Sequence, residues 1–77
     1  MGYDTLHLGN ETLYRDQFTG EISDGSGNKR GCIPVNPFTG MGYGTIDGVK
    51  TEIQGECIYQ NGANPLIGRT GTRKIGA

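Results

Sequence analysis

The sequence predicts an all-β protein, a small antiparallel sheet of short hairpins with glycine-rich loops and extended termini. Three observations lead to this prediction. The pair Asp47-Gly48 is the preferred type I′ turn and separates two segments of β-forming residues. Apolar and polar residues alternate after this turn with the period of two that a half-buried strand requires. Glycine fills 15 of the 77 positions and separates the apolar segments at short intervals.

The N-terminal part of the chain predicts two strands, over residues 3–8 and 11–18. They meet at Gly9 and Asn10, a pair of turn residues. A helix over residues 11–18 is the alternative. The segment is short for a helix and has no apolar stripe, so we favour the strand.

The middle of the chain predicts a loop followed by a strand at the edge of the sheet. Residues 23–31 are polar and glycine-rich, which favours a loop or a flexible arm. Residues 32–35 contain apolar positions, but Pro34 has no N–H to donate to a central ladder. Residues 32–35 can therefore form only an edge strand.

The hairpin around Asp47-Gly48 carries a definite register. If Ile46 pairs with Val49, then Gly44 stands opposite Thr51, and Gly42 stands opposite Ile53 on the same apolar face. The incoming strand is then nearly bare on this face, and another backbone or side chain can approach it closely. The alternative is that the strand is twisted or bulged around Gly42 and Gly44.

A further strand is expected after this hairpin, over residues 56–60, and Asn61-Gly62 ends it. We treat residues 1–77 as one small β domain. Residues 66–77 carry three basic side chains and no acidic one, which predicts a basic C-terminal arm.

The apolar content is low for a chain that folds alone. Apolar residues make up 32% of the sequence, and glycine adds no side chain to a core while losing the most backbone freedom on ordering. Small domains compensate with disulfides, a metal or a partner. Cys32 and Cys57 supply at most one bridge, and two small buried thiols are the simpler interpretation. With His7 as the only histidine and no CxxC pair, we expect no metal. These observations favour a partner.

The charges differ between the two ends of a chain whose formal net charge is −1. Residues 1–24 contain five acidic side chains and one basic side chain, whereas the C-terminal arm is basic. Head-to-tail contact between subunits would pair these ends. The alternative is that both ends are solvated.

An imperfect repeat crosses the predicted strands. Phe18-Thr19-Gly20 recurs as Phe38-Thr39-Gly40, and each copy is followed by an isoleucine and an Asp-Gly pair. Together with residues 47–50 and 55–62, these segments resemble the Phe-Thr-Gly and Asn-Gly landmarks of MORN-like hairpin repeats, over residues 13–62 at most. The resemblance implies a curved sheet of stacked hairpins that acts as a scaffold or binding surface.

The sequence offers little for catalysis or cofactor binding. His7 lies between Leu6 and Leu8 and is expected to have a half-buried structural role rather than to activate a nucleophile. The glycine-rich residues 25–31 miss the dinucleotide pattern by one residue and lack its strand and helix. No apolar segment approaches the length of a membrane span. We therefore expect no enzyme activity, no cofactor and no membrane insertion.

These observations together predict a non-enzymatic structural subunit that is ordered by packing in a homo-oligomer or a larger assembly. A capsid, decoration or tail component of a virion is its most concrete form. A protein-binding scaffold built from hairpin repeats is one alternative. A weak nucleic-acid binder, with basic side chains on phosphates and Tyr14 or Tyr43 stacking on bases, is disfavoured by the net charge. Residues 1–20 show no secretory signal, so we expect cytoplasmic synthesis. The residues predicted to contact partners are Phe18, Phe38, Leu66, Ile67, Arg69, Arg73 and Lys74.

Overall fold

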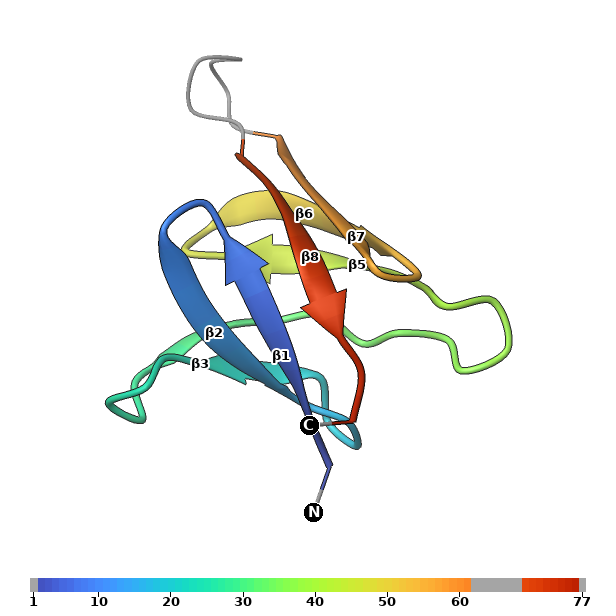
Figure 1. Cartoon of the computed structure of the whole chain (residues 1–77), viewed down its shortest axis with the longest axis horizontal. Helices are drawn as coiled ribbons and strands as arrows, with labels where there is room; N and C mark the ends of the chain where they lie inside the picture. The colour runs from blue at the N-terminus through green and yellow to red at the C-terminus, as the bar shows by residue number, and fades with distance from the viewer. Residues whose placement is uncertain (1, 62–68, 77) are drawn as a thin grey trace.

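The computed structural model of the chain is a closed barrel of eight strands (Figure 1). It describes residues 2–61 and 69–76. Each strand pairs in antiparallel fashion with its neighbours in the sequence, and β1 also pairs with β8, which closes the ladder. The strands are β1 Tyr3–Leu8, β2 Glu11–Asp16, β3 Glu21–Ser23, β4 Lys29–Cys32, β5 Met41–Ile46, β6 Val49–Gln54, β7 Cys57–Asn61 and β8 Arg69–Lys74. The predicted all-β fold is confirmed, while its closure into a barrel was not foreseen.

The first predicted hairpin is present, and the helical alternative for residues 11–18 is wrong. Strands β1 and β2 pair from Tyr3↔Asp16 to Leu8↔Glu11, around the turn at Gly9 and Asn10. Strand β2 ends two residues earlier than predicted, at Asp16. It ends there because the Asp16 carboxylate accepts hydrogen bonds from the next backbone amides and fixes a turn.

The hairpin around Asp47-Gly48 is confirmed in position and register. Its pairs include Ile46↔Val49, Gly44↔Thr51 and Gly42↔Ile53. The φ angles of Asp47 and Gly48 are 55° and 78°, as a type I′ turn requires. The missing side chain on this face of β5 allows the neighbouring backbone to approach, since a Cβ atom at Gly44 would overlap the carbonyl oxygen of Cys32. The close backbone approach is therefore the correct one of the two alternatives.

The predicted loop over residues 23–31 is shorter than expected. Ser23 ends β3 and Lys29 begins β4, which leaves residues 24–28 as the turn. The Asp24 carboxylate organises this turn by accepting hydrogen bonds from the backbone N–H groups of Ser26 and Asn28, at 2.9 and 3.0 Å. A polar, glycine-rich sequence here forms a tight capped turn between two paired strands.

The predicted edge strand over residues 32–35 is not an edge strand, because a closed barrel has no edge. Cys32 is the last residue of β4, and Pro34 follows outside the strands. Val35 returns to the ladder only through a single bridge to Gly42.

The structure also replaces most of the expected C-terminal arm with a strand. Residues 69–74 form β8, which is hydrogen-bonded to β7 on one side and to β1 on the other. A basic, glycine-containing segment becomes ordered here because the two flanking strands of the same chain satisfy its backbone groups.

The barrel interior is filled by eight fully buried aliphatic side chains. They come from seven successive parts of the chain and are Leu6, Leu8, Leu13, Ile22, Ile33, Ile46, Ile53 and Ile58. Glycines at further inward positions let neighbouring strands approach, since a Cβ at Gly31 or Gly71 would overlap a carbonyl oxygen of the adjacent strand. A narrow barrel with glycines at its closest approaches therefore needs fewer apolar side chains than the composition suggested.

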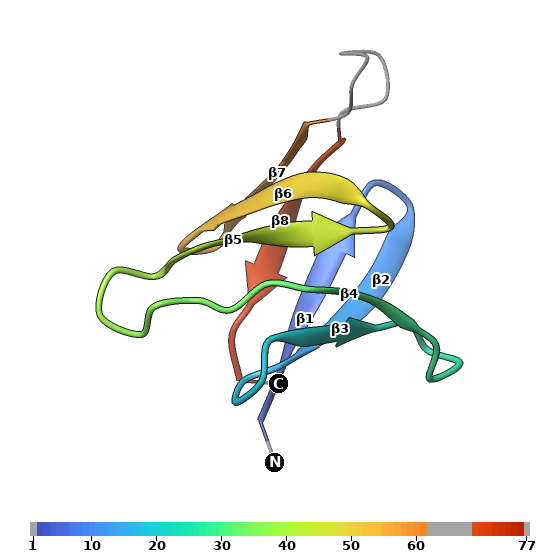
Figure 2. The ribbon, with the colours of Figure 1, turned by 180° about the vertical axis from the view of Figure 1, so that it is seen from behind.

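The up-and-down order of the strands places alternate connections at opposite ends of the barrel. One end holds both termini and the connections after β2, β4 and β6, as Figures 1 and 2 show. The other end holds the turns at Gly9-Asn10, at residues 24–28 and at Asp47-Gly48. We call the first end the rim, made of Gly2 and residues 17–20, 33–40 and 55–56.

Candidate functional site

Two turns of the rim have the same architecture and carry the repeated Phe-Thr-Gly sequence. In the first turn, Asp16 Oδ1 accepts hydrogen bonds from the backbone N–H groups of Phe18 and Thr19, at 2.7 and 3.1 Å. In the second turn, Asn36 Oδ1 accepts the equivalent bonds two and three residues later, at 2.8 and 3.3 Å. The repeat is therefore structural as well as sequential, and aspartate and asparagine perform the same task in it.

The other residues of the motif also have matching roles. The hydroxyl oxygens of Thr19 and Thr39 accept hydrogen bonds from the backbone N–H two residues later, at 3.2 and 3.3 Å. Gly20 and Gly40 end the turns with φ angles of 79° and 73°, in the left-handed region that favours glycine. The side chains of Phe18 and Phe38 are the exception, because they point outward and take no part in holding the turn together.

Phe18 and Phe38 are accordingly the most exposed large apolar side chains of the described residues, at 91% and 96%. Met41 and Ile75, at the rim ends of β5 and β8, are also exposed. An aromatic ring held in water on an ordered turn is available for contact with another molecule.

Backbone hydrogen bonds tie the connections of the rim to one another. Each of four bonds joins one connection or terminal segment to the next one around the barrel. They run from Gln17 N–H to Gly2 O, from Ile33 N–H to Gly20 O, from Gly55 N–H to Gly40 O and from Arg73 N–H to Glu56 O, at 2.8–2.9 Å. The two phenylalanines therefore project from connections that are hydrogen-bonded to their neighbours.

A buried ionic cluster lies directly beneath the rim. Asp4 of β1 points into the barrel between Arg15 of β2 and Arg73 of β8, and its Oδ2 accepts a hydrogen bond of 2.9 Å from Nη1 of each arginine. The Nε of Arg15 donates to the carbonyl of Ile33, and the Nε of Arg73 donates to that of Gly55. The cluster thus connects the first, second and last strands to the rim.

Asp4 is ionised in this environment. Burial acts against its charge, but hydrogen bonds from Gln17, Arg73 and Arg15 outweigh burial and lower the pKa of the carboxyl. Its Oδ1 accepts from Gln17 Nε2 at 3.0 Å and from the backbone N–H of Gly76 at 3.4 Å. One acidic residue of the N-terminal part, Asp4, therefore pairs with one basic residue of the C-terminal part, Arg73, within the same molecule.

A second ionic cluster lies near the other end of the barrel. The Arg30 guanidinium donates to the Asp47 carboxylate through Nε and Nη2, and to the Glu11 carboxylate through Nη1 and Nη2. These hydrogen bonds raise the pKa of Arg30. Lys29 forms an ion pair of 3.2 Å with Glu21. Both cations of this region are therefore paired with carboxylates of the same chain.

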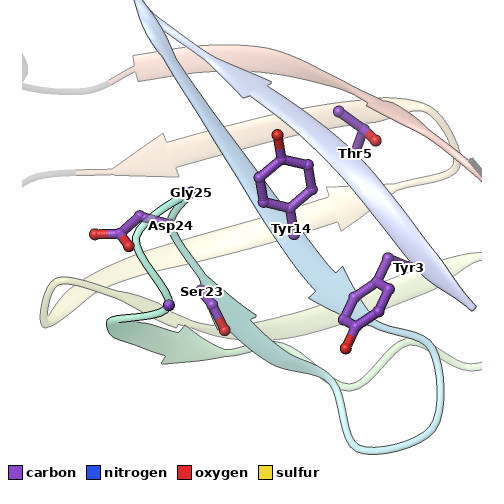
Figure 3. Close-up of a pocket in the computed structure, with 7 residues that line it drawn as sticks. Tyr3, Thr5, Tyr14, Ser23, Asp24 and Gly25 are labelled. Carbon is purple, nitrogen blue, oxygen red and sulfur yellow. The ribbon is translucent and has the colours of Figure 1, made fainter.

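A shallow groove of about 500 Å³ on the outer wall is lined by tyrosines, as Figure 3 shows. The ring of Tyr14 stands between Thr5 and Ser23, with Tyr3 further along β1. Asp24 borders the groove but directs its carboxylate away from Tyr14 (Figure 3), toward its own turn. The groove has an aromatic wall with hydroxyl groups from its tyrosines, Thr5 and Ser23.

The structure places the predicted contact residues in different settings. Phe18, Phe38 and Lys74 are exposed at the rim end of the barrel. Arg73 is buried against Asp4, and Arg69 is the first residue of β8. Leu66 and Ile67 lie outside the described residues. Asp4 and Arg15 were not predicted as site residues. Both stand on the same face of their strands as the buried leucines of β1 and β2. That shared face is the signal that would have revealed a buried pair.

The sulfur and imidazole groups differ from expectation. Cys57 is exposed and Cys32 is half-buried, so the expected pair of buried thiols is wrong. Both are free cysteines, and the strands that carry them are separated by β5 and β6. His7 is exposed rather than half-buried. It faces Cys57 across Thr72, at a Cα separation on the order of 10 Å for two strand spacings. No hydrogen bond joins the two side chains.

Within residues 2–61 and 69–76, no three His, Cys, Asp or Glu side chains are grouped as metal ligands. The same residues contain no helix able to cross a membrane. Comparisons of the chain with protein-family models, with curated proteins and with solved structures gave no significant match. The geometry of the rim is therefore the main indication of what the chain does.

Proposed function

We propose that the chain is a non-enzymatic assembly subunit, a small barrel that docks through its rim onto further copies of itself. The observation that carries this proposal is the pair of matched turns that expose Phe18 and Phe38 almost completely. Both turns lie at the same end of the barrel.

The energetics of the rim suit a docking surface. Burying one phenylalanine side chain contributes about 1.5–3 kcal/mol, so the two rings together supply a substantial apolar anchor. Their turns are fixed by capping side chains and by the backbone bonds of the rim, so little backbone order has to be gained on docking. Met41 and Ile75, at the rim ends of β5 and β8, are further exposed apolar side chains at this end of the barrel.

The sequence analysis predicts a virion component as the setting for such a subunit, and this stays part of the proposal. The exposed Lys74 lies at the same end of the barrel, where rim charges influence partner orientation more than affinity.

The test is the mass of the chain in solution, measured by sedimentation and light scattering from micromolar to millimolar concentration. We expect the wild-type chain to self-associate and the double variant Phe18→Ser, Phe38→Ser to stay monomeric. The control is Tyr43→Ser, Tyr59→Ser, which removes two exposed aromatic rings from the barrel wall and leaves the rim intact.

Two results would refute the proposal. The first is a wild-type chain that remains monomeric over the whole range with a sharp thermal transition, which favours the alternative of a free binding module. The second is a rim variant that associates as strongly as the wild type.

A further inference from the structure

The two arginines beneath the rim have donor groups that the protein does not use. The Arg15 and Arg73 side chains are only 5% and 6% exposed. Each donates its Nε to a rim carbonyl and its Nη1 to Asp4. No described residue accepts a hydrogen bond from the Nη2 of either arginine.

Both arginines line a cavity in the mouth of the barrel, and Arg73 also lines a second hollow beside Glu56 and Lys74. In the described part of the chain, no side-chain nitrogen or oxygen is both fully buried and without a partner, so both Nη2 groups reach solvent. The solvent-filled space that both arginines line is a cavity of about 420 Å³. Its polar wall also includes Gln17, and its apolar wall is formed by Val35, Pro37 and Ile75.

The residues that line the cavity carry one positive charge in excess, from two arginines and one aspartate. Asp4 carries one negative charge because its pKa is lowered, and the two arginines carry two positive charges. Asp16 is not among the lining residues, and its Oδ1 accepts hydrogen bonds from the amides of its own turn, although its charge also attracts Arg15. A buried guanidinium with an unused donor and no full counter-charge is costly, and a bound anion would relieve that cost.

We propose that the barrel mouth binds a monocarboxylate carried on a short apolar stem. The two carboxylate oxygens accept hydrogen bonds from the free Nη2 groups, and the stem packs against Val35, Pro37 and Ile75. A monoanion balances the excess charge, whereas a phosphate dianion would leave one negative charge uncompensated in a site that already holds Asp4. The carboxylate belongs either to a small aliphatic acid or to a polypeptide.

The experiment is an NMR titration of the full chain, following the Nε–Hε signals of its arginines. Sodium butyrate is added against sodium chloride and sodium phosphate at matched ionic strength. We expect butyrate to shift the Arg15 and Arg73 signals saturably, while Arg30, whose donors are occupied by Asp47 and Glu11, stays unchanged. Because this measurement does not require self-association, a negative result would not count against the proposed function, and the reverse also holds.

Two variants test whether the arginine cluster binds a carboxylate or only stabilises the barrel. Arg73→Lys keeps the charge but removes Nη2, and we expect butyrate affinity to fall about tenfold or more, as for the loss of one charge-assisted hydrogen bond. In case this variant does not fold, Ile75→Ser changes an exposed wall residue. It should weaken butyrate but not acetate, and Met41→Ser, outside the cavity, should weaken neither.

The proposal is overturned if butyrate produces no saturable shift, if chloride or phosphate matches it, or if Ile75→Ser binds butyrate like the wild type. Tighter binding of a short peptide with a free C-terminal valine than of butyrate assigns the site to a polypeptide. Equal or weaker binding of that peptide assigns it to a small acid.

Discussion

Closure of the barrel depends most directly on Gly71. This residue lies in β8, opposite Leu8 of β1 and Ile58 of β7. A Cβ atom at this position would overlap the carbonyl oxygen of His7 and lie 3.0 Å from the Leu8 Cα. The φ angle of Gly71 is outside the left-handed region, so Gly71→Ala introduces no backbone strain of that kind and tests mainly the available space.

The cost can be worked out from these contacts. Overpacking against backbone costs about 1–3 kcal/mol, and each ladder hydrogen bond lost as β8 moves away adds about 1 kcal/mol. The lower flexibility of the unfolded chain returns about 0.4–1 kcal/mol. We expect the free energy of unfolding to fall by about 2–3 kcal/mol, which lowers Tm by roughly 10–20 °C for a domain of this size.

Thermal and urea unfolding followed by circular dichroism measure this change. The matched control is Gly25→Ala, because Gly25 also has a φ outside the left-handed region and a Cβ there would meet nothing within 4 Å. We expect the control to match the wild type or exceed it slightly. Equal stability of Gly71→Ala and Gly25→Ala would refute the argument that β8 closes the barrel against β1.

Three further predictions concern other parts of the chain. Asn36→Ala should lower the free energy of unfolding by about 1 kcal/mol because two turn amides lose their acceptor, whereas Asn36→Asp should preserve it, as Asp16 does in the matching turn; urea unfolding compares them. The pKa values of Asp4 and Asp16 are lowered in the folded chain, so stability should be full above the ordinary aspartate pKa of about 4 and should fall as the pH drops through the lowered values. Urea titrations at several pH values test this. Asp16→Asn should reduce the dependence of the unfolding free energy on pH. A stability that is constant or rises toward acid would contradict the lowered pKa values. A thiol reagent should modify Cys57 faster than Cys32 in the native chain, and equal rates would show that the half-burial of Cys32 does not protect it.

Sequence reasoning succeeded where a structure is fixed by residues close together in the chain. The Asp47-Gly48 hairpin was predicted to the residue because the turn sets the register and the alternation sets the face. The Phe-Thr-Gly repeat was recognised as a pattern. Its equal turn geometry follows from short side chains that bond the nearest backbone amides, so it does not by itself require a common origin of the two copies.

The errors have a common cause, which is that they involve partners far apart in the sequence. The C-terminal segment looked like a free arm because its strand becomes stable only between β7 and β1. Arg73 was expected at an interface with other molecules, yet it pairs with Asp4 across 69 residues of the same chain. Composition suggested a weak core because it cannot show that inward glycines draw the strands together.

The sequence by itself determined the two hairpins around Gly9-Asn10 and Asp47-Gly48 and the two phenylalanines beside flexible turns, since alternation and side-chain capping act over a few residues. Only the tertiary structure decided that β1 and β8 meet. That meeting closes the barrel, buries Asp4 between two arginines and gathers the phenylalanine turns at one end. Its physical basis is the pairing of backbone groups and charges from opposite ends of the chain, which no local pattern records.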